Sequence, residues 1–194
     1  MGTPAFAVPT LDRIASEGHE VVAVYTQPDR PKGRGQQLAA SPVKECALRL
    51  GLEVRQPERI RRPEVVAQLA GMGADAMVVV GYGQIIPQAI IDLPRYGIVN
   101  VHASLLPKLR GAAPIQWAIA NGDTVTGVTT MMIDAGLDTG DMLLRAETAI
   151  GTAETAPELG ERLAASGAEL LAETLRSITR GTVPRQPQNN ADAT

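Results

Sequence analysis

The sequence predicts an α/β domain with a mostly parallel sheet flanked by helices. Apolar runs of strand length alternate with helical segments through the first half of the chain. Several runs, such as Met77-Val-Val-Val80, are continuously apolar, as in strands buried on both faces of a parallel sheet. A β-branched, alternating run at 124–133 and a further expected strand at 142–146 add antiparallel strands late. The 194 residues suit one domain of ordinary size.

The chain opens with turn residues, and Thr3 is placed to cap a helix that runs to Glu17 before Gly18. A strand at 20–26 follows. A βαβ unit needs a strand before its helix, so we expect that strand upstream of Met1 rather than a fold that begins on a helix.

Residues 27–38 contain two prolines, two glycines and the cations Arg30, Lys32 and Arg34. Proline and glycine at this density favour turns over regular structure. We therefore expect an exposed, mobile, basic loop.

The remaining elements follow from caps, breakers and periodicity. In chain order they are a helix capped by Ser41 and reaching Leu50, a strand at 53–56, a helix at 63–72, a strand at 76–80, a brief helix between Pro87 and Pro94, a strand at 97–102, a helix at 114–121, the two late strands, and a long amphipathic helix at 156–180 ended by Gly181. Polar residues dominate from Thr182 onward, where we expect no closing element.

Composition narrows the function. The net charge of −3 argues against a chain that binds polyanions over its whole surface, so any nucleic-acid contact must be local. Cys46 has no second cysteine to pair with, which fits a reducing compartment. We see no apolar run of membrane-spanning length and no signal peptide, and therefore expect a globular protein of the cytoplasm with no membrane partner.

Several familiar motifs fail on inspection. Gly81-Tyr-Gly83 follows a strand, but Ile86 stands where a dinucleotide-binding loop needs its third glycine. The aspartates at 134, 138 and 141 lack the glycine and the glutamate of a Ca²⁺ loop, and one cysteine with two distant histidines cannot form a zinc site. Ser104 lacks the glycines of a hydrolase elbow.

The strongest candidate site combines Asn100, His102 and Asp138. The two-residue period of a strand places Asn100 and His102 on one face, at the end of the strand. Either alone is more often structural: a satisfied core histidine, or a strand-end asparagine bonded to its own backbone. We expect Asp138, on a glycine-bounded loop, to join them at the carboxyl ends of the strands, where open α/β sheets bind ligands. His19, in a turn, should face solvent.

These residues lie within a longer pattern: Asn100-x-His102-x-Ser104-Leu-Leu-Pro107, then Arg110-Gly111-Ala-Ala-x-Ile115, then Asp134-x-Gly-Leu-Asp138-Thr-Gly140. The pattern resembles the 10-formyltetrahydrofolate-dependent formyltransferases, which have a Rossmann-like catalytic domain. The resemblance implies formyl transfer to an amine without a metal, with Asn100, His102 and Asp138 as catalytic residues. It also implies a folate site formed by Gly83, Gln84, Ile85, Ile86, Ser104, Leu105, Leu106 and Pro107.

Three further segments resemble the family members that formylate methionyl initiator tRNA for translation initiation: Gly2-Thr-Pro-x-Phe6-Ala-Val-Pro9, the 27–35 loop, and Ser41-Pro-Val-Lys44. The resemblance implies that Arg30, Lys32 and Arg34 approach the tRNA; a charged loop that is only solvated is the alternative. It assigns 1–180 to the catalytic domain and 181–194 to a linker toward a C-terminal β-barrel domain, in a monomer.

Two alternatives stay open. The chain could formylate a small amine such as a sugar nucleotide, which the basic loop disfavours. It could also be an inactive fragment that binds folate or tRNA, which the intact Asn100, His102 and Asp138 disfavour.

Overall fold

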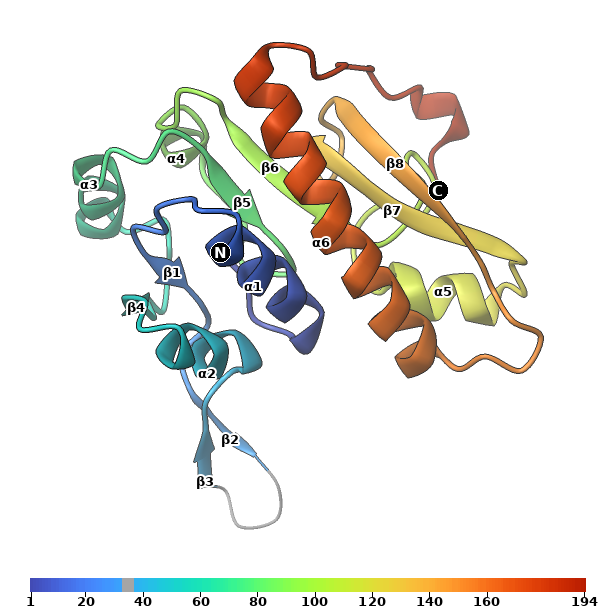
Figure 1. Ribbon diagram of the computed structural model, residues 1–194, viewed down its shortest axis with the longest axis horizontal. Helices are drawn as coiled ribbons and strands as arrows, with labels where there is room; N and C mark the ends of the chain where they lie inside the picture. The colour runs from blue at the N-terminus through green and yellow to red at the C-terminus, as the bar shows by residue number, and fades with distance from the viewer. Residues whose placement is uncertain (33–36) are drawn as a thin grey trace.

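A central sheet runs through the computed structural model, which describes residues 1–32 and 37–194 (Figure 1). Four strands lie in the order β5 (Met77–Val79), β6 (Ile98–His102), β7 (Val125–Met132) and β8 (Met142–Ala149). β5 and β6 are parallel, whereas β6, β7 and β8 pair antiparallel. A parallel pair, β1 (Val24–Tyr25) and β4 (Val54–Arg55), lies beyond β5. The predicted sheet, parallel first and antiparallel late, is confirmed.

The first two residues join these two groups of strands. The Gly2 amide donates to the Tyr25 carbonyl at 2.9 Å, and the Val80 amide donates to the Met1 carbonyl at 2.9 Å. Met1 and Gly2 therefore run between β1 and β5. A side chain at Gly2 would place its Cβ 2.9 Å from the Val80 carbonyl oxygen, so the close approach requires glycine.

Helices cover both faces of the sheet. They are α1 (Val8–Ser16, preceded by the 3₁₀ turn η1, Ala5–Ala7), α2 (Pro42–Arg49), α3 (Pro63–Gly71), α4 (Gln88–Ile91), α5 (Pro114–Ala120) and α6 (Ala156–Arg180), followed by the 3₁₀ turn η2 (Asn190–Asp192). Figure 1 shows α1 and α6 side by side in front of the sheet, with α6 across β7 and β8. None of the helices in the described part of the chain is long and apolar enough to cross a membrane.

Two apolar clusters fill the space between these layers. Val99 and Val101 point toward α1, α2 and α6, where they pack with Leu171 of the long helix. Ile98 points to the opposite face, in a cluster with residues of α3 and α4. β6 therefore alternates as predicted, and Asn100 and His102 share the face of Ile98.

Local signals placed the helices well, but three expectations at the start of the chain were wrong. The strand expected at 20–26 is reduced to Val24–Tyr25, the two residues that pair with β4. Thr3 does not cap α1: its hydroxyl donates to the Tyr82 carbonyl at 3.1 Å and accepts from the Gln27 amide at 3.4 Å. The expected 27–38 loop contains a short antiparallel hairpin, β2 (Arg30–Lys32) with β3 (Gln37–Ala39).

Ser41 is confirmed as the cap of α2, and its contribution can be measured. Its hydroxyl oxygen accepts from the Lys44 amide at 3.1 Å and lies 2.7 Å from the buried Thr26 hydroxyl. Ser41→Ala is expected to lower the free energy of unfolding by about 0.5–2 kcal/mol in a urea titration. Ser166→Ala, the same change inside α6, should be close to neutral because no helix end depends on it. Equal losses for the two variants would contradict a capping role.

Candidate active site

Asn100 and His102 form the base of the site, at the carboxyl end of β6. Both are largely buried, with 9% and 6% of their surface exposed. β6 lies between β5 and β7, with Asn100 opposite Val79 on one side and Met131 on the other. Strand pairing on both sides fixes the backbone of β6, so the two polar side chains project in a defined direction.

The Asp138 carboxylate meets both of them. Asn100 Nδ2 donates to Asp138 Oδ1 at 3.3 Å, and His102 Nδ1 lies 3.6 Å from Asp138 Oδ2. The Gly111 amide donates to the same Oδ2 at 2.8 Å. Amide, imidazole and carboxylate therefore converge, as the spacing along the sequence predicts.

The loop that carries Asp138 reaches the site by an indirect route. β7 is antiparallel to β6, so the loop after Met132 begins beside Val99, at the amino end of β6. Asp138 nevertheless joins the other two residues at the carboxyl end of β6, as expected, although its loop leaves the sheet at the opposite edge. Residues 133–141 fold back so that Asp138 reaches His102, and Asp138 itself has a left-handed φ of 51°. A non-glycine residue held there stores strain of about 1–3 kcal/mol, which the surrounding contacts must offset.

The His102 ring is held on both sides by oxygen atoms. Its Nε2 lies 2.7 Å from the Leu109 carbonyl oxygen, which can only accept a hydrogen bond. Its Nδ1 faces the Asp138 carboxylate. Both ring nitrogens therefore face acceptors, and the doubly protonated imidazolium satisfies both contacts.

The turn after β6 is anchored to β7. The Thr129 hydroxyl donates to the Ser104 carbonyl at 2.7 Å and accepts from the Leu106 amide at 3.1 Å. Thr129 is fully buried. Sequence reasoning missed this residue, because nothing in a β-branched strand distinguishes a threonine that bonds across the sheet from one that only packs.

Some of the residues expected to bind folate are exposed, whereas the side chains of others are buried or hydrogen-bonded within the fold. Ile85 is 89% exposed, whereas Ile86 and Leu106 are buried in apolar clusters. The Gln84 side chain is already engaged: it accepts from the Ile60 amide at 2.7 Å and donates to the Pro57 carbonyl at 3.2 Å. Gly83 has a left-handed φ of 81°, and the Ser104 hydroxyl donates to the Lys108 carbonyl. Leu105 and Pro107 are half-buried.

The basic residues of the 27–38 segment are only partly described. Arg30 is exposed on β2, and Lys32 is the last residue of that strand. Arg34 lies outside the described residues. Among the residues that are described, no cluster of three His, Cys, Asp or Glu side chains could hold a metal ion.

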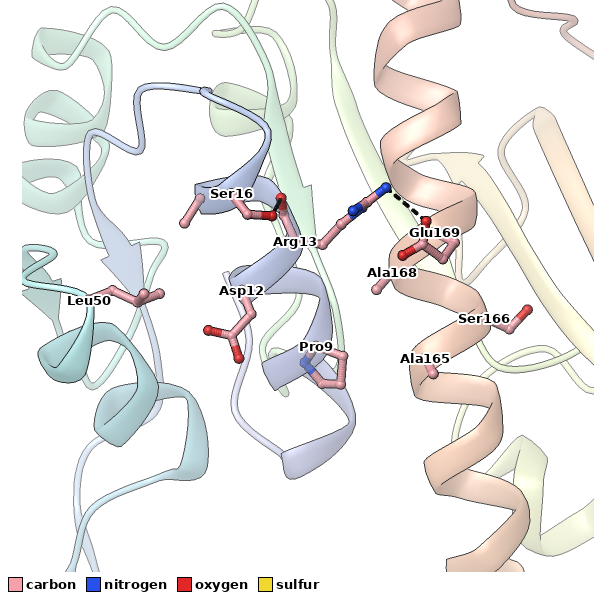
Figure 2. A pocket seen from close by; sticks show the side chains of 10 residues that line it. Pro9, Asp12, Arg13, Ser16, Leu50, Ala165, Ser166, Ala168 and Glu169 are labelled. Carbon is pink, nitrogen blue, oxygen red and sulfur yellow. Dashed lines mark hydrogen bonds and ion pairs between the residues drawn. The ribbon is translucent and has the colours of Figure 1, made fainter.

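A separate hollow of about 870 Å³ lies between α1 and α6 (Figure 2). Pro9, Leu50, Ala165 and Ala168 line it, and an ion pair between Arg13 and Glu169 at 2.9 Å crosses it. None of the polar residues at the end of β6 reaches this hollow, so it is not part of the candidate site.

Tyr82, in the loop after β5, has an orphaned hydroxyl. The side chain is 1% exposed, and its oxygen has no hydrogen-bond partner within residues 1–32 and 37–194. Because an unsatisfied buried hydroxyl costs free energy, Tyr82→Phe is expected to raise the free energy of unfolding by about 1 kcal/mol at pH 7. Tyr96→Phe, at a half-buried tyrosine, is the matched control.

The same substitution has a pH signature. Burial raises the pKa of Tyr82 to about 12, from an ordinary value of 10.0. The unfolded chain therefore loses this proton first as the pH rises, so stability falls between pH 10 and pH 12. Tyr82→Phe should remove this part of the alkaline loss. The assignment would be contradicted if Tyr82→Phe were less stable than the unaltered protein at pH 7 and lost as much stability as that protein between pH 10 and pH 12.

An amide, an imidazole and a carboxylate thus meet at the end of a central strand of an α/β sheet, an arrangement that can assist proton transfer at a carbonyl group. The chain belongs to the formyl transferase family, whose model matches residues 1–175.

Two kinds of similarity accompany the family match. The methionyl-tRNA formyltransferase of Solibacter usitatus (strain Ellin6076) is 66% identical over all 194 residues, and the chain spans 62% of the length of that relative. Among solved structures, glycinamide ribonucleotide transformylase 1 from Symbiobacterium toebii superposes with a TM-score of 0.78 at 21% identity, covering 97% of this chain and 91% of that one. An N-formyltransferase from Helicobacter canadensis, in complex with folinic acid and dTDP-3-aminofucose, gives 0.72 at 21% identity and covers 100% and 67%. These likenesses confirm the predicted fold.

Proposed function

We propose that the protein transfers a formyl group from 10-formyltetrahydrofolate to the α-amine of methionyl initiator tRNA, for translation initiation in the cytoplasm. The observation that carries the proposal is the convergence of Asn100 and His102 on the Asp138 carboxylate. The 66% identity to a methionyl-tRNA formyltransferase supports this choice of acceptor.

The reaction forms a C–N bond between the neutral α-amine and the formyl carbon, and breaks the bond from that carbon to N10 of the folate. Negative charge develops on the formyl oxygen as the carbon becomes tetrahedral. Asn100 Nδ2 carries two hydrogens and gives one to Asp138, so the second can be donated to that oxygen. A protonated His102 adds its positive charge beside that oxygen, while its two N–H groups face the Leu109 carbonyl and the Asp138 carboxylate.

Asp138 has two roles in this scheme. Its charge stabilises the imidazolium of His102. It also accepts the proton that the attacking amine loses and, through water, returns a proton to the leaving N10. The Gly111 amide at 2.8 Å keeps Oδ2 in place while this happens.

The folate donor would lie against the loops at 83–86 and 104–107. Backbone groups suit this role better than the side chains do, because Gln84 and Leu106 are already engaged in the fold. The complex of the Helicobacter canadensis enzyme with folinic acid supports a folate-type donor within this fold. No step of the proposed transfer requires a metal ion.

The tRNA would be contacted through Arg30, Lys32 and Arg34, whose charges can neutralise phosphates. We assign 1–180 to the catalytic domain and 181–194 to the segment leading toward a second domain that assists tRNA binding. The protein would act as a monomer.

The acceptor can be tested directly. Purified full-length protein should formylate methionyl-tRNA with 10-formyltetrahydrofolate, and should act far more slowly on free methionine or on an amino-sugar nucleotide. Formylation of the small amines alone would establish the small-amine alternative. If the protein bound folate and tRNA but formylated no acceptor, the result would establish the alternative of an inactive binding module.

A further inference from the structure

The segment after α6 contacts the candidate site, although the sequence marks it as a polar connection. The Gln186 amide and carbonyl pair with the backbone of Met142, both at 2.9 Å, so this part of the segment lies along β8. Figure 1 shows the red end of the chain returning past that strand. Two residues further on, Gln188 is half-buried, whereas Pro187 and Asn189 are exposed.

Both N–H groups and the carbonyl oxygen of the Gln188 side chain bond to two loops. Its Nε2 donates to the carbonyls of Asp138 at 2.9 Å and Gly140 at 2.8 Å. Its Oε1 accepts from Arg110 Nε at 2.9 Å. Each of the two N–H donors has an acceptor, and the oxygen accepts one hydrogen bond.

Those two loops carry the partners of His102 and of Asp138. Arg110 stands between Leu109, whose carbonyl holds His102 Nε2, and Gly111, whose amide holds Asp138 Oδ2. Leu109 and Asp138 both have left-handed φ values, of 57° and 51°, which non-glycine residues keep only under external constraint. Gln188 supplies such a constraint to both loops at once.

We propose that Gln188 is a positioning residue: by joining the Asp138 loop to Arg110, it holds the Asp138 carboxylate against His102 and Asn100. The kinetic part of this assignment rests on the proposed formyl transfer, whereas the structural part does not.

The substrate-free test is amide hydrogen exchange of the full-length protein, measured by NMR. In Gln188→Ala, the Gly111 amide should exchange about 10-fold faster or more, because the Asp138 loop opens more often. The control Gln186→Ala changes the same residue type two positions away, where backbone atoms make the contacts, and should leave Gly111 protected. Unchanged protection in Gln188→Ala would overturn the proposal.

The kinetic test separates positioning from general support of the fold. Gln188→Ala should lower kcat about 10- to 100-fold, with little change in KM for the tRNA, because small misplacements at a reacting centre cost rate. In an Asp138→Ala background the same change should have no further effect, since it acts through Asp138. A second loss of equal size in that background would show a merely structural role.

Gln188→Glu separates the hydrogen bond with Arg110 from those to the Asp138 loop. It also serves as a second variant in case Gln188→Ala does not fold. It keeps the acceptor for Arg110 but removes the N–H donors to the Asp138 and Gly140 carbonyls. We expect it to match Gln188→Ala in both exchange and kcat; full activity in Gln188→Glu would overturn the proposal. If the unaltered protein shows no formylation, the proposed function fails, and the exchange of Gly111 still decides whether Gln188 positions the loop.

Discussion

His102→Ala is expected to lower kcat for formylation of methionyl-tRNA by about 100-fold or more, since it removes the positive charge that stabilises the developing oxyanion. His102 is 6% exposed, and its ring contacts the Leu109 carbonyl and the Asp138 carboxylate. No neighbouring side chain can therefore move into the position of the ring unless the site rearranges. The affinity for the folate donor, measured by titration of the free protein, should change little.

His19 provides the matched control, because it is exposed in the turn after α1. His19→Ala should retain the turnover of the unaltered protein. Equal losses of turnover and of folate affinity in His102→Ala would show that the ring binds the donor rather than assists the transfer.

Leu171→Ala is expected to lower the free energy of unfolding by about 2–5 kcal/mol, the usual range for a leucine removed from a packed core. Leu171 lies in the middle of α6, is fully buried, and packs against Val101 and Val128 of the sheet. The cavity left behind would lie directly behind the strand that carries Asn100 and His102.

The comparison substitution is Leu48→Ala in α2, where 59% of the side chain is exposed. Helix propensity and the number of atoms removed are nearly the same in the two cases, so the difference in urea midpoint measures burial. A Leu48 variant as unstable as the Leu171 variant would contradict the role assigned to the α6 interface.

Elements with strong local signals were predictable. The bounds of α6 agree with the expected 156–180, because its apolar positions repeat every 3.6 residues and Gly181 adopts the left-handed conformation that ends a helix. The shared face of Asn100 and His102 follows from the geometry of any strand. The hairpin of β2 and β3 was not predictable in the same way, because its proline and glycine content indicates a turn and does not show whether the flanks pair.

The sequence by itself therefore determined the α/β class, the helices and which residues could form a proton-handling site. Only the tertiary structure decided how Asp138 reaches that site, since an antiparallel β7 sends its loop to the far edge and the chain must fold back. It also decided that Thr129 and Gln188 hold the surrounding loops. Periodicity reports contacts between near neighbours in the chain, whereas these hydrogen bonds join residues 25 and 50 positions apart, which no local pattern records.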